Sequence, residues 1–404
     1  MDLSPFDTEQ IGIKTLEKSL IKTKSERSLK IGLPKETSND ERRISLTPGG
    51  VSILAANGHE ILVEKNAGIN AHFSDKEYQE AGATISYSAE ELFSQSEMIV
   101  KVAPPTHKEL QWMQPNQILL SALHLGHTTK EFIHTILEKG ICGIGYEFIK
   151  SEDSEFPIVR MMHEITGSMS VQIASHYLEN SSNGQGIMLG GISGIPPATV
   201  AILGAGITGE YAARTALGYG AQVFVMDNDL AMLRRLENAL DRRIITATAN
   251  HQYLSTAMEF ADVVIGAAMT EGERAPCWVT DPMVQSMKPG SVIVDTVIDQ
   301  GGCISTSVPT THSNPIFKKY DVVHYCVPNI PSNVARTATH ALSNVIVPYL
   351  VDLGEAGGIE GCLWKNTALR NGAYTYKKNL TKKSLANQFD MPFRDIEVLI
   401  ASQI

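Results

Sequence analysis

Residues 204–209 form a glycine-rich motif of the kind that binds phosphate groups. The motif follows a short apolar run, residues 200–203, and precedes a stretch with helical periodicity. In a G-x-G-x-x-G pattern the first glycine permits a tight turn, the second lets the backbone approach a pyrophosphate, and the third allows a helix to pack closely on a strand. The N-terminus of the helix adds N–H groups and a partial positive charge. We predict that the following residues bind a dinucleotide: Gly204, Ala205, Gly206, Ile207, Thr208 and Gly209.

An acidic residue completes this motif. Asp227 ends the next predicted strand, residues 222–226, about 20 residues beyond the glycines. A carboxylate at this place can accept hydrogen bonds from both hydroxyls of an adenosine ribose, and it would repel a 2′-phosphate. This favours NAD over NADP as the cofactor. The alternative is that the glycines form an incidental turn and Asp227 is an ordinary residue at the end of a strand.

Three further side chains could carry out hydride-transfer chemistry on a small charged substrate. Such a site needs a cation for a carboxylate and an acid/base group that titrates near neutral pH. Arg43 follows the first predicted strand, His124 lies in the stretch SALHLG, and Asp299 follows a strand of the nucleotide-binding region. Ligands of doubly wound folds bind beyond the carboxyl ends of strands. We therefore predict that these three residues meet the substrate.

Each of these residues also has a structural interpretation. Arg43 could lie on the surface, and its neighbour Arg42 makes the choice of arginine ambiguous. His124 lies between two leucines and could be an interior histidine with its hydrogen bonds satisfied. Asp299 precedes Gln300 and two glycines and could serve only to form a turn.

Composition excludes several classes of function. The net charge of −10 over 404 residues argues against nucleic-acid and anionic-membrane partners. Five scattered cysteines, without a C-x-x-C pair, indicate reduced thiols rather than disulfides or a metal site. No stretch reaches the roughly 18 apolar residues of a membrane span, and the N-terminus is polar. We expect a cytoplasmic protein without a bound metal.

Predicted strands alternate with predicted helices along the chain, which favours an α/β fold with parallel sheets covered on both faces. The expected architecture is two doubly wound, Rossmann-like domains, with the NAD domain inserted in the substrate domain and a cleft between them for the substrate. We expect a helical C-terminal tail and a solvated face bearing Arg234 and Arg235. The predicted boundaries are residues 1–29 for an N-terminal arm, 30–160 plus 337–404 for the substrate domain, and 161–336 for the NAD domain.

Ordered motifs over residues 30–351 resemble the family of alanine dehydrogenases and transhydrogenase domains. The resemblance implies a hexameric, NAD-dependent enzyme that interconverts L-alanine with pyruvate and ammonia. The matching stretches are IGLPKETSNDERRISLTPGGV, GHEILVEKNAG, KVAPP, LHLG, the glycine motif with Asp227, MKPGSVIVDTVIDQGGC and HYCVPNIPSNVARTAT.

The resemblance also implies roles for single residues. The arginine before I/V-x-L-T-P holds the substrate carboxylate and matches Arg43. The histidine of L-H-L is the acid/base and matches His124. The aspartate of I-D-Q-G-G assists at the reacting carbon and matches Asp299, and the asparagine of Y-C-V-x-N-[MI]-P contacts the nicotinamide side and matches Asn329.

The chain departs from the family pattern at three positions. The second lysine of K-V-K-E-P, which binds substrate, is Ala103 in this chain. Lys101 would point to the same face of a strand from about 6.6 Å away, so it could compensate in part, and only by reaching. The serine of M-S-E-x-x-G that touches the pyrophosphate is His163, and a lysine after the ribose aspartate is Met232.

These departures keep alternatives to oxidative deamination of alanine open. A related NAD(P)-dependent imine reductase would join a keto acid to an amine, and Ala103 would leave room for the larger partner. A catalytically weak NAD-binding homologue is also compatible with the loss of the lysine. A module of a proton-translocating transhydrogenase is disfavoured, because that branch lacks the aspartate of I-D-Q-G-G and a membrane segment is absent.

Overall fold

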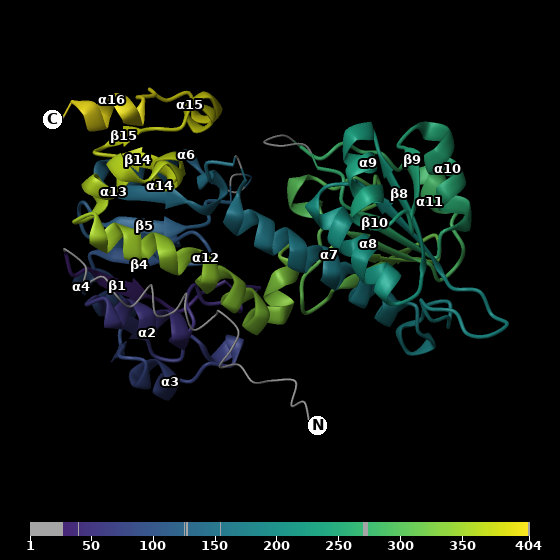
Figure 1. The fold of residues 1–404 in the computed structure, drawn as a ribbon, viewed down its shortest axis with the longest axis horizontal. Coiled ribbons are helices and arrows are strands. Elements are labelled where there is room, and N and C mark those ends of the chain that lie inside the picture. Colours follow the sequence, from purple (N-terminus) through teal and green to yellow (C-terminus); the bar gives the residue numbers. More distant parts are fainter. Residues whose placement is uncertain are drawn as a thin grey trace, which may run out of the picture. The chain divides into compact units, whose positions relative to one another are not determined.

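The computed structural model describes residues 27–38, 40–124, 126, 128–153, 155–269 and 274–402. The chain forms two compact units (Figure 1). Unit 1 contains the chain up to Val159 and again from Val334 onwards, and unit 2 contains Arg160–Asn333. Of the arm expected over residues 1–29, only the last three residues lie within the described part of the chain.

The sheet of unit 1 is mostly parallel. Among the described residues it has eight strands in the order β15-β14-β6-β5-β4-β1-β2-β3, and only β14 runs antiparallel to the others. The order reverses at β1, which lies between β4 and β2, so a ligand crevice is expected beyond the carboxyl ends of β1 and β4. The strands are β1 (Lys30–Leu33), β2 (Glu60–Glu64), β3 (Thr84–Ser86), β4 (Met98–Val100), β5 (Ile118–Ser121), β6 (Cys142–Gly145), β14 (Ala373–Tyr376) and β15 (Asn379–Leu380).

Helices of unit 1 bury apolar side chains against this sheet. One core cluster joins the sheet to α4, α5, α6 and α15, while α2 packs on α12. Helix α2 begins with Thr47 as N-cap and Pro48 in its first turn, where the missing N–H of proline costs no hydrogen bond. The helices, with 3-10 turns written η, are α2 (Pro48–Ala56), η1 (Ile69–Ala71), α3 (Asp75–Glu80), α4 (Ala89–Gln95), α5 (His107–Trp112), α6 (Lys130–Glu138), η2 (Tyr146–Phe148), α12 (Ala335–Glu355), α13 (Ile359–Lys365), α14 (Thr367–Gly372), α15 (Lys383–Phe389) and α16 (Ile396–Ala401).

The sheet of unit 2 has seven strands among the described residues, in the order β12-β13-β11-β10-β7-β8-β9. Only β12 is antiparallel. Its central strands are buried on both faces and rich in Val and Ile, as parallel strands between two helix layers must be. The strands are β7 (Thr199–Leu203), β8 (Gln222–Asp227), β9 (Ile245–Thr248), β10 (Val263–Gly266), β11 (Val292–Asp295), β12 (Ile316–Lys319) and β13 (Val322–Tyr325).

Two apolar clusters cover the two faces of this second sheet. Helices α7, α8 and α9 contribute to one cluster, and α10 and α11 contribute to the other. The chain order reverses at β7, which lies between β10 and β8, so the glycine motif after β7 stands at the point where such folds bind ligands. The helices are α7 (Pro157–Tyr177), η3 (Asn180–Ser182), α8 (Ile207–Gly218), α9 (Leu230–Ala239), α10 (His251–Phe260), α11 (Asp281–Gln285), η4 (Ile298–Gln300) and η5 (Ile330–Val334).

The C-terminal tail differs from the prediction, because it is not helical throughout. Strands β14 and β15 form a hairpin that adds to the edge of the unit 1 sheet next to β6. Its two-residue turn is Lys377-Lys378, and both residues have left-handed φ values, 45° and 61°. Turns of this type usually carry Asn-Gly, so two lysines gave no hairpin signal.

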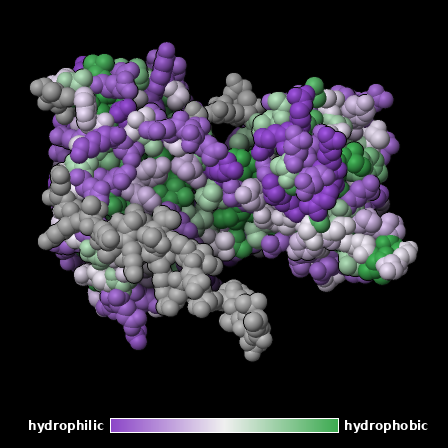
Figure 2. All heavy atoms as spheres, in the orientation of Figure 1, coloured by the Kyte–Doolittle hydropathy of each residue, from purple (hydrophilic) through white to green (hydrophobic). Residues whose placement is uncertain are grey.

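Figure 2 shows hydrophilic side chains over much of the visible face, with smaller hydrophobic patches between them. Within the part of the chain that the structure describes, no helix is both long enough and apolar enough to span a membrane.

Candidate functional site

The glycine motif of unit 2 adopts the backbone that its sequence demands. Gly204 has a φ of 112°, and a Cβ there would lie 2.5 Å from the Ala267 carbonyl oxygen. A Cβ on Gly209 would lie 1.9 Å from the carbonyl oxygen of Gly204, so α8 can approach β7 only with glycine at this position. Among the residues that the structure describes, a Cβ on Gly206 would meet no atom within 4 Å, so the second glycine faces space that these residues leave open.

The start of α8 is suited to an anion. Gly206 is its N-cap and supplies no side-chain hydrogen bond, so the first N–H groups of the helix have no side-chain cap at that position. These N–H groups and the open space at Gly206 fit a pyrophosphate, since nothing bulky stands where its oxygens would accept hydrogen bonds. The residues present therefore fit the dinucleotide that the sequence predicts.

Asp227 is tied to the glycine turn. Its Oδ2 atom accepts a hydrogen bond from the N–H of Ala205 at 2.6 Å, and its Oδ1 atom accepts one from the N–H of Asp229 at 2.9 Å. The carboxylate thus holds the turn against the end of β8. Its contact with ribose hydroxyls stays a prediction, and the contact with Ala205 is one that the sequence did not indicate.

Asp299 and Asn329 follow β11 and β13, whose carboxyl ends share the sheet edge of the glycine turn. Asp299 is exposed in η4, and Asn329 has a φ of 60° just before η5. Asp295, the last residue of β11, is buried, and its Oδ1 atom accepts a hydrogen bond from the N–H of Val297 at 3.3 Å. Gly302 has a φ of 74°, and a Cβ there would lie 2.9 Å from Asp295 Oδ2, so the loop folds closely over this buried carboxylate.

In unit 1, Arg43 is buried and paired with Glu41. Its Nε atom donates to Glu41 Oε1 at 2.7 Å and its Nη2 atom to Glu41 Oε2 at 2.6 Å. Burial alone would lower the pKa of the guanidinium, but the Glu41 carboxylate raises it above its ordinary value. The pair fixes the plane of the Arg43 guanidinium.

Lys101 follows β4 and is enclosed by carboxylates. Its Nζ atom lies 2.7 Å from Glu109 Oε1 and 3.4 Å from Glu36 Oε2, and the side chain is 1% exposed. Burial alone would lower the pKa of Lys101, but Glu36 and Glu109 raise it. The ammonium of Lys101 is thus paired within unit 1. That Lys101 binds the substrate in place of the family lysine, which is Ala103 in this chain, stays a prediction.

Glu36 lies close to two cations, Lys101 and Arg43, and to two other carboxylates, Glu41 and Glu109. Its Oε1 atom accepts the N–H of Val102 at 2.7 Å, and its buried Oε2 atom lies 3.4 Å from the Lys101 ammonium. Burial raises the pKa of Glu36 to about 7, with Lys101 acting in the opposite direction. This carboxyl group can therefore hold a proton near neutral pH.

His124 follows β5 and is exposed, which excludes the interior histidine considered from the sequence. It has a φ of 52°. Glu147, after β6, accepts hydrogen bonds from the N–H groups of both Leu123 and His124 at 2.9 Å. The carboxylate thus fixes the backbone that carries the imidazole.

Sequence reasoning missed several charged and polar residues around these side chains. Tyr146 donates a hydrogen bond to the Lys101 carbonyl oxygen at 2.6 Å. The spacing E-x-R in DERR was a usable signal for the Glu41–Arg43 pair. The other contacts join residues that are farther apart in the sequence, and no sequence motif indicated them. The missed residues are Glu36, Glu41, Glu109, Tyr146 and Glu147.

The predicted residues fall into two groups. Arg43, Lys101 and His124 all lie beyond the ends of strands of the unit 1 sheet. The Glu36 carboxylate interacts electrostatically with both Arg43 and Lys101. Asp299 and Asn329 lie in unit 2 together with the glycine turn.

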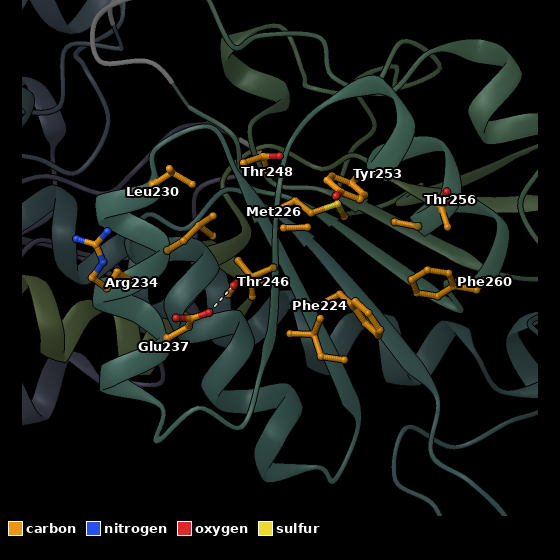
Figure 3. A pocket seen from close by; sticks show the side chains of 15 residues that line it. Phe224, Met226, Leu230, Arg234, Glu237, Thr246, Thr248, Tyr253, Thr256 and Phe260 are labelled. Carbon is orange, nitrogen blue, oxygen red and sulfur yellow. Dashed lines mark hydrogen bonds between the residues drawn. The ribbon is translucent and has the colours of Figure 1, made fainter.

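Unit 2 also has a cavity of about 700 Å³ around the edge strand β9 (Figure 3). Phe224 and Phe260 line it with their ring centroids 4.8 Å apart, and Arg234 and Glu237 line it from α9. None of the residues predicted from the sequence to bind or react lines this cavity.

Comparison with known proteins agrees with this arrangement. Residues 32–166 match the N-terminal domain, and residues 170–383 the C-terminal domain, of the family described as alanine dehydrogenase/PNT. An alanine dehydrogenase of Methanococcus maripaludis is 40% identical over 91% of this chain and 98% of its own. One of Mycolicibacterium smegmatis is 38% identical over 92% of this chain and 100% of its own.

Solved structures give the same result. An L-alanine dehydrogenase structure superposes with a TM-score of 0.85 at 38% identity, over 90% of this chain and 99% of that chain. A transhydrogenase of Sinorhizobium meliloti shares the fold, with a TM-score of 0.76 at 21% identity over 88% of this chain and 99% of that chain. The chain therefore belongs to the alanine dehydrogenase/PNT family.

Proposed function

We propose that this protein is an NAD-dependent amino-acid dehydrogenase that converts L-alanine reversibly to pyruvate and ammonia. The observation that carries the proposal is the 40% identity to an alanine dehydrogenase over nearly the whole of both chains. The glycine turn and Asp227 support NAD as cofactor, because the turn is open at Gly206 and a carboxylate stands at the end of β8.

Residues of the glycine turn would hold the dinucleotide. The backbone N–H groups of Gly206 and Ile207 would bind its pyrophosphate, Asp227 its ribose, and Asn329 the nicotinamide side. When bound, NAD accepts a hydride from the α-carbon of the substrate.

The protein side chains would bind the substrate and move its protons. Arg43 binds the substrate carboxylate, since a guanidinium held in one plane by Glu41 offers parallel donors. His124 takes a proton from the amino group, releases it to solvent, and then takes a proton from the attacking water, because imidazole titrates near neutral pH. Asp299 stabilises the carbinolamine that water addition forms.

The proposal is tested by the spectrum of NADH. Purified protein with NAD and L-alanine should generate absorbance at the NADH band, and pyruvate with ammonium and NADH should consume it. The His124→Ala variant should lose at least about a hundredfold in kcat, as loss of a general acid/base does. Absence of NAD reduction with any small L-amino acid would contradict the proposal.

A second candidate follows from one observation, the enclosure of Lys101. Ala103 supplies no cation, and the Lys101 ammonium is paired with Glu36 and Glu109. The short side chain of Ala103 would leave room for an amine larger than ammonia. The protein would then be an imine reductase of the same family, which joins a keto acid to that amine. Pyruvate and NADH offered with ammonium or with primary amines separate the two, because faster NADH consumption with an amine favours the second.

We also propose a cytoplasmic homo-oligomer, a hexamer by resemblance to the family, with a small amino acid or 2-oxo acid as its partner. Light scattering during gel filtration measures the mass directly. A mass other than six times that of the chain would contradict the hexamer without affecting the proposed reaction.

A further inference from the structure

The glycine turn of unit 2 is held from both sides by charged side chains. Ala205, in the middle of the turn, is fully buried. Its N–H donates to Asp227 Oδ2 at 2.6 Å, and its carbonyl oxygen accepts from Arg235 Nη2 at 3.3 Å. Arg235 lies on α9, so a second helix contacts the turn that precedes α8. The sequence predicted a solvated face for Arg235, and the residue is exposed, but its side chain also makes this contact, which the sequence did not indicate.

The contact from Arg235 sets the direction of a neighbouring donor. The Ala205 carbonyl and the Gly206 N–H belong to one trans peptide, in which the C=O and N–H bonds point in opposite directions. Holding the carbonyl toward Arg235 therefore points the Gly206 N–H away from Arg235. Gly206 is the N-cap of α8, and the space beside its α-carbon is open.

Arg235 also affects the charge near the start of α8. Glu210 lies in the first turn of this helix, where a carboxylate would repel a bound pyrophosphate. Arg235 Nη1 donates to Glu210 Oε2 at 2.6 Å, and Arg214 Nη2 donates to Glu210 Oε1 at 2.7 Å. Burial raises the pKa of Glu210, but the hydrogen bonds from the two arginines outweigh this and lower it. The carboxylate therefore stays ionised, and the two guanidinium groups balance its charge.

We propose that Arg235 is a positioning residue for the pyrophosphate of the dinucleotide. It orients the Gly206 N–H toward the phosphate oxygens and offsets the negative charge of Glu210. The inference rests on the proposed function, because it requires that the turn binds a dinucleotide. The new element is Arg235, which comes from α9 and acts through its contact with the glycine turn, not through the ligand.

The test is a titration of the full-length protein with NAD and with ADP-ribose by isothermal calorimetry. The Arg235→Met variant should bind both about tenfold or more weakly, as expected for the loss of a charge-assisted contact. Arg234→Met is the matched control, because it removes the same charge from the adjacent position on α9, where Arg234 lines the cavity of Figure 3. It should change either dissociation constant less than about twofold, in keeping with a screened surface charge.

Further variants separate positioning from a general structural role. Arg235→Lys keeps a positive charge without the guanidinium fork and should bind NAD with intermediate affinity. Adding Glu210→Gln to Arg235→Met should recover part of the lost affinity, because the charge that Arg235 offsets is then gone. In turnover assays Arg235→Met should raise KM for NAD and leave kcat at saturating NAD unchanged, which a destabilised fold would not do.

The outcomes distinguish this inference from the proposed function. If the wild-type protein binds neither NAD nor ADP-ribose, the proposed function fails. If the wild type binds and Arg235→Met or Arg235→Lys binds equally well, the role of Arg235 is refuted. Equal weakening by Arg234→Met and Arg235→Met would also refute it, since only net charge would then matter.

Discussion

Glu147 Oε1 accepts a hydrogen bond from the backbone N–H of His124 at 2.9 Å. His124 has a φ of 52°, in a region that residues other than glycine seldom occupy, so its backbone needs such an anchor. The carboxylate comes from the turn after β6 and the imidazole from the loop after β5, two neighbouring strands. The side chain proposed as acid/base is thus oriented through its main chain.

Removal of this anchor should lower turnover. The Glu147→Ala variant leaves the N–H groups of Leu123 and His124 without their acceptor, and kcat should fall about tenfold to a hundredfold as the imidazole loses its position. Glu147→Gln keeps one acceptor oxygen and should lose less. Steady-state kinetics with L-alanine and NAD measure both. Unchanged kcat in Glu147→Ala would show that His124 needs no anchor or does not act in the reaction.

Replacement of Lys101 should destabilise unit 1. In Lys101→Met the buried carboxylates of Glu36 and Glu109 lose the cation that lies between them, and the free energy of unfolding should fall by about 3–5 kcal/mol. Urea denaturation followed by circular dichroism measures this. The double variant with Glu109→Gln should recover part of the loss. A decrease below about 1 kcal/mol would mean that water or movement relieves the buried charge.

The glycine motif gives a pair of contrasting variants. A Cβ on Gly206 would meet no atom of the described part of the chain within 4 Å, so Gly206→Ala should fold with wild-type thermal stability. It should nevertheless bind NAD at least about tenfold more weakly, because the methyl group occupies the approach of the pyrophosphate. A Cβ on Gly209 would lie 1.9 Å from the Gly204 carbonyl oxygen, so Gly209→Ala should lower the melting temperature. Calorimetry and thermal unfolding test both, and tight NAD binding by Gly206→Ala would contradict the assigned pyrophosphate position.

The sequence predicted the order of strands and helices well because apolar runs and glycine punctuation are local. It did not predict the two antiparallel hairpins. Both have two-residue turns with left-handed φ values, Lys377-Lys378 and Tyr320-Asp321, and neither carries the usual Asn-Gly signal. The motifs likewise proposed Arg43 and His124 as site residues, and the E-x-R spacing indicates Glu41 as a partner of Arg43, whereas the pairing of Glu147 with His124 is defined by geometry. Only the fold brings a carboxylate after β6 to a histidine after β5.

Asp295 should make stability depend on pH. Burial raises the pKa of this carboxyl group from 3.8 to about 6. Since the folded protein then holds the proton more tightly than the unfolded chain, stability from this group is greatest below about pH 4 and falls as pH rises toward 6. Asp295→Asn removes the dependence, so the variant should gain up to about 3 kcal/mol relative to wild type between pH 4 and pH 7.

Urea denaturation at the two pH values measures this gain. Asp281 is a control of opposite sign, because its hydrogen bond from Lys319 lowers its pKa. Asp281→Asn should lose stability relative to wild type at pH 7 and lose less at low pH. A difference between wild type and Asp295→Asn that does not vary with pH would show that Asp295 titrates alike in the folded and unfolded states.

Ala103→Lys tests what the missing cation means for the substrate. Ala103 follows β4 at the reversal point of the unit 1 sheet, and Lys101 is committed to Glu36 and Glu109. A lysine at 103 would add a charge-assisted contact to a small carboxylate, so KM for pyruvate should fall about tenfold. Ala103→Met is the matched control, because it adds similar length without charge and should not lower KM. If both variants leave KM unchanged, the side chain at 103 does not face the substrate. Ala103→Lys could also lower KM with pyruvate and ammonium and raise it with larger amines. That result would show that the native site selects its amine by size and not by charge.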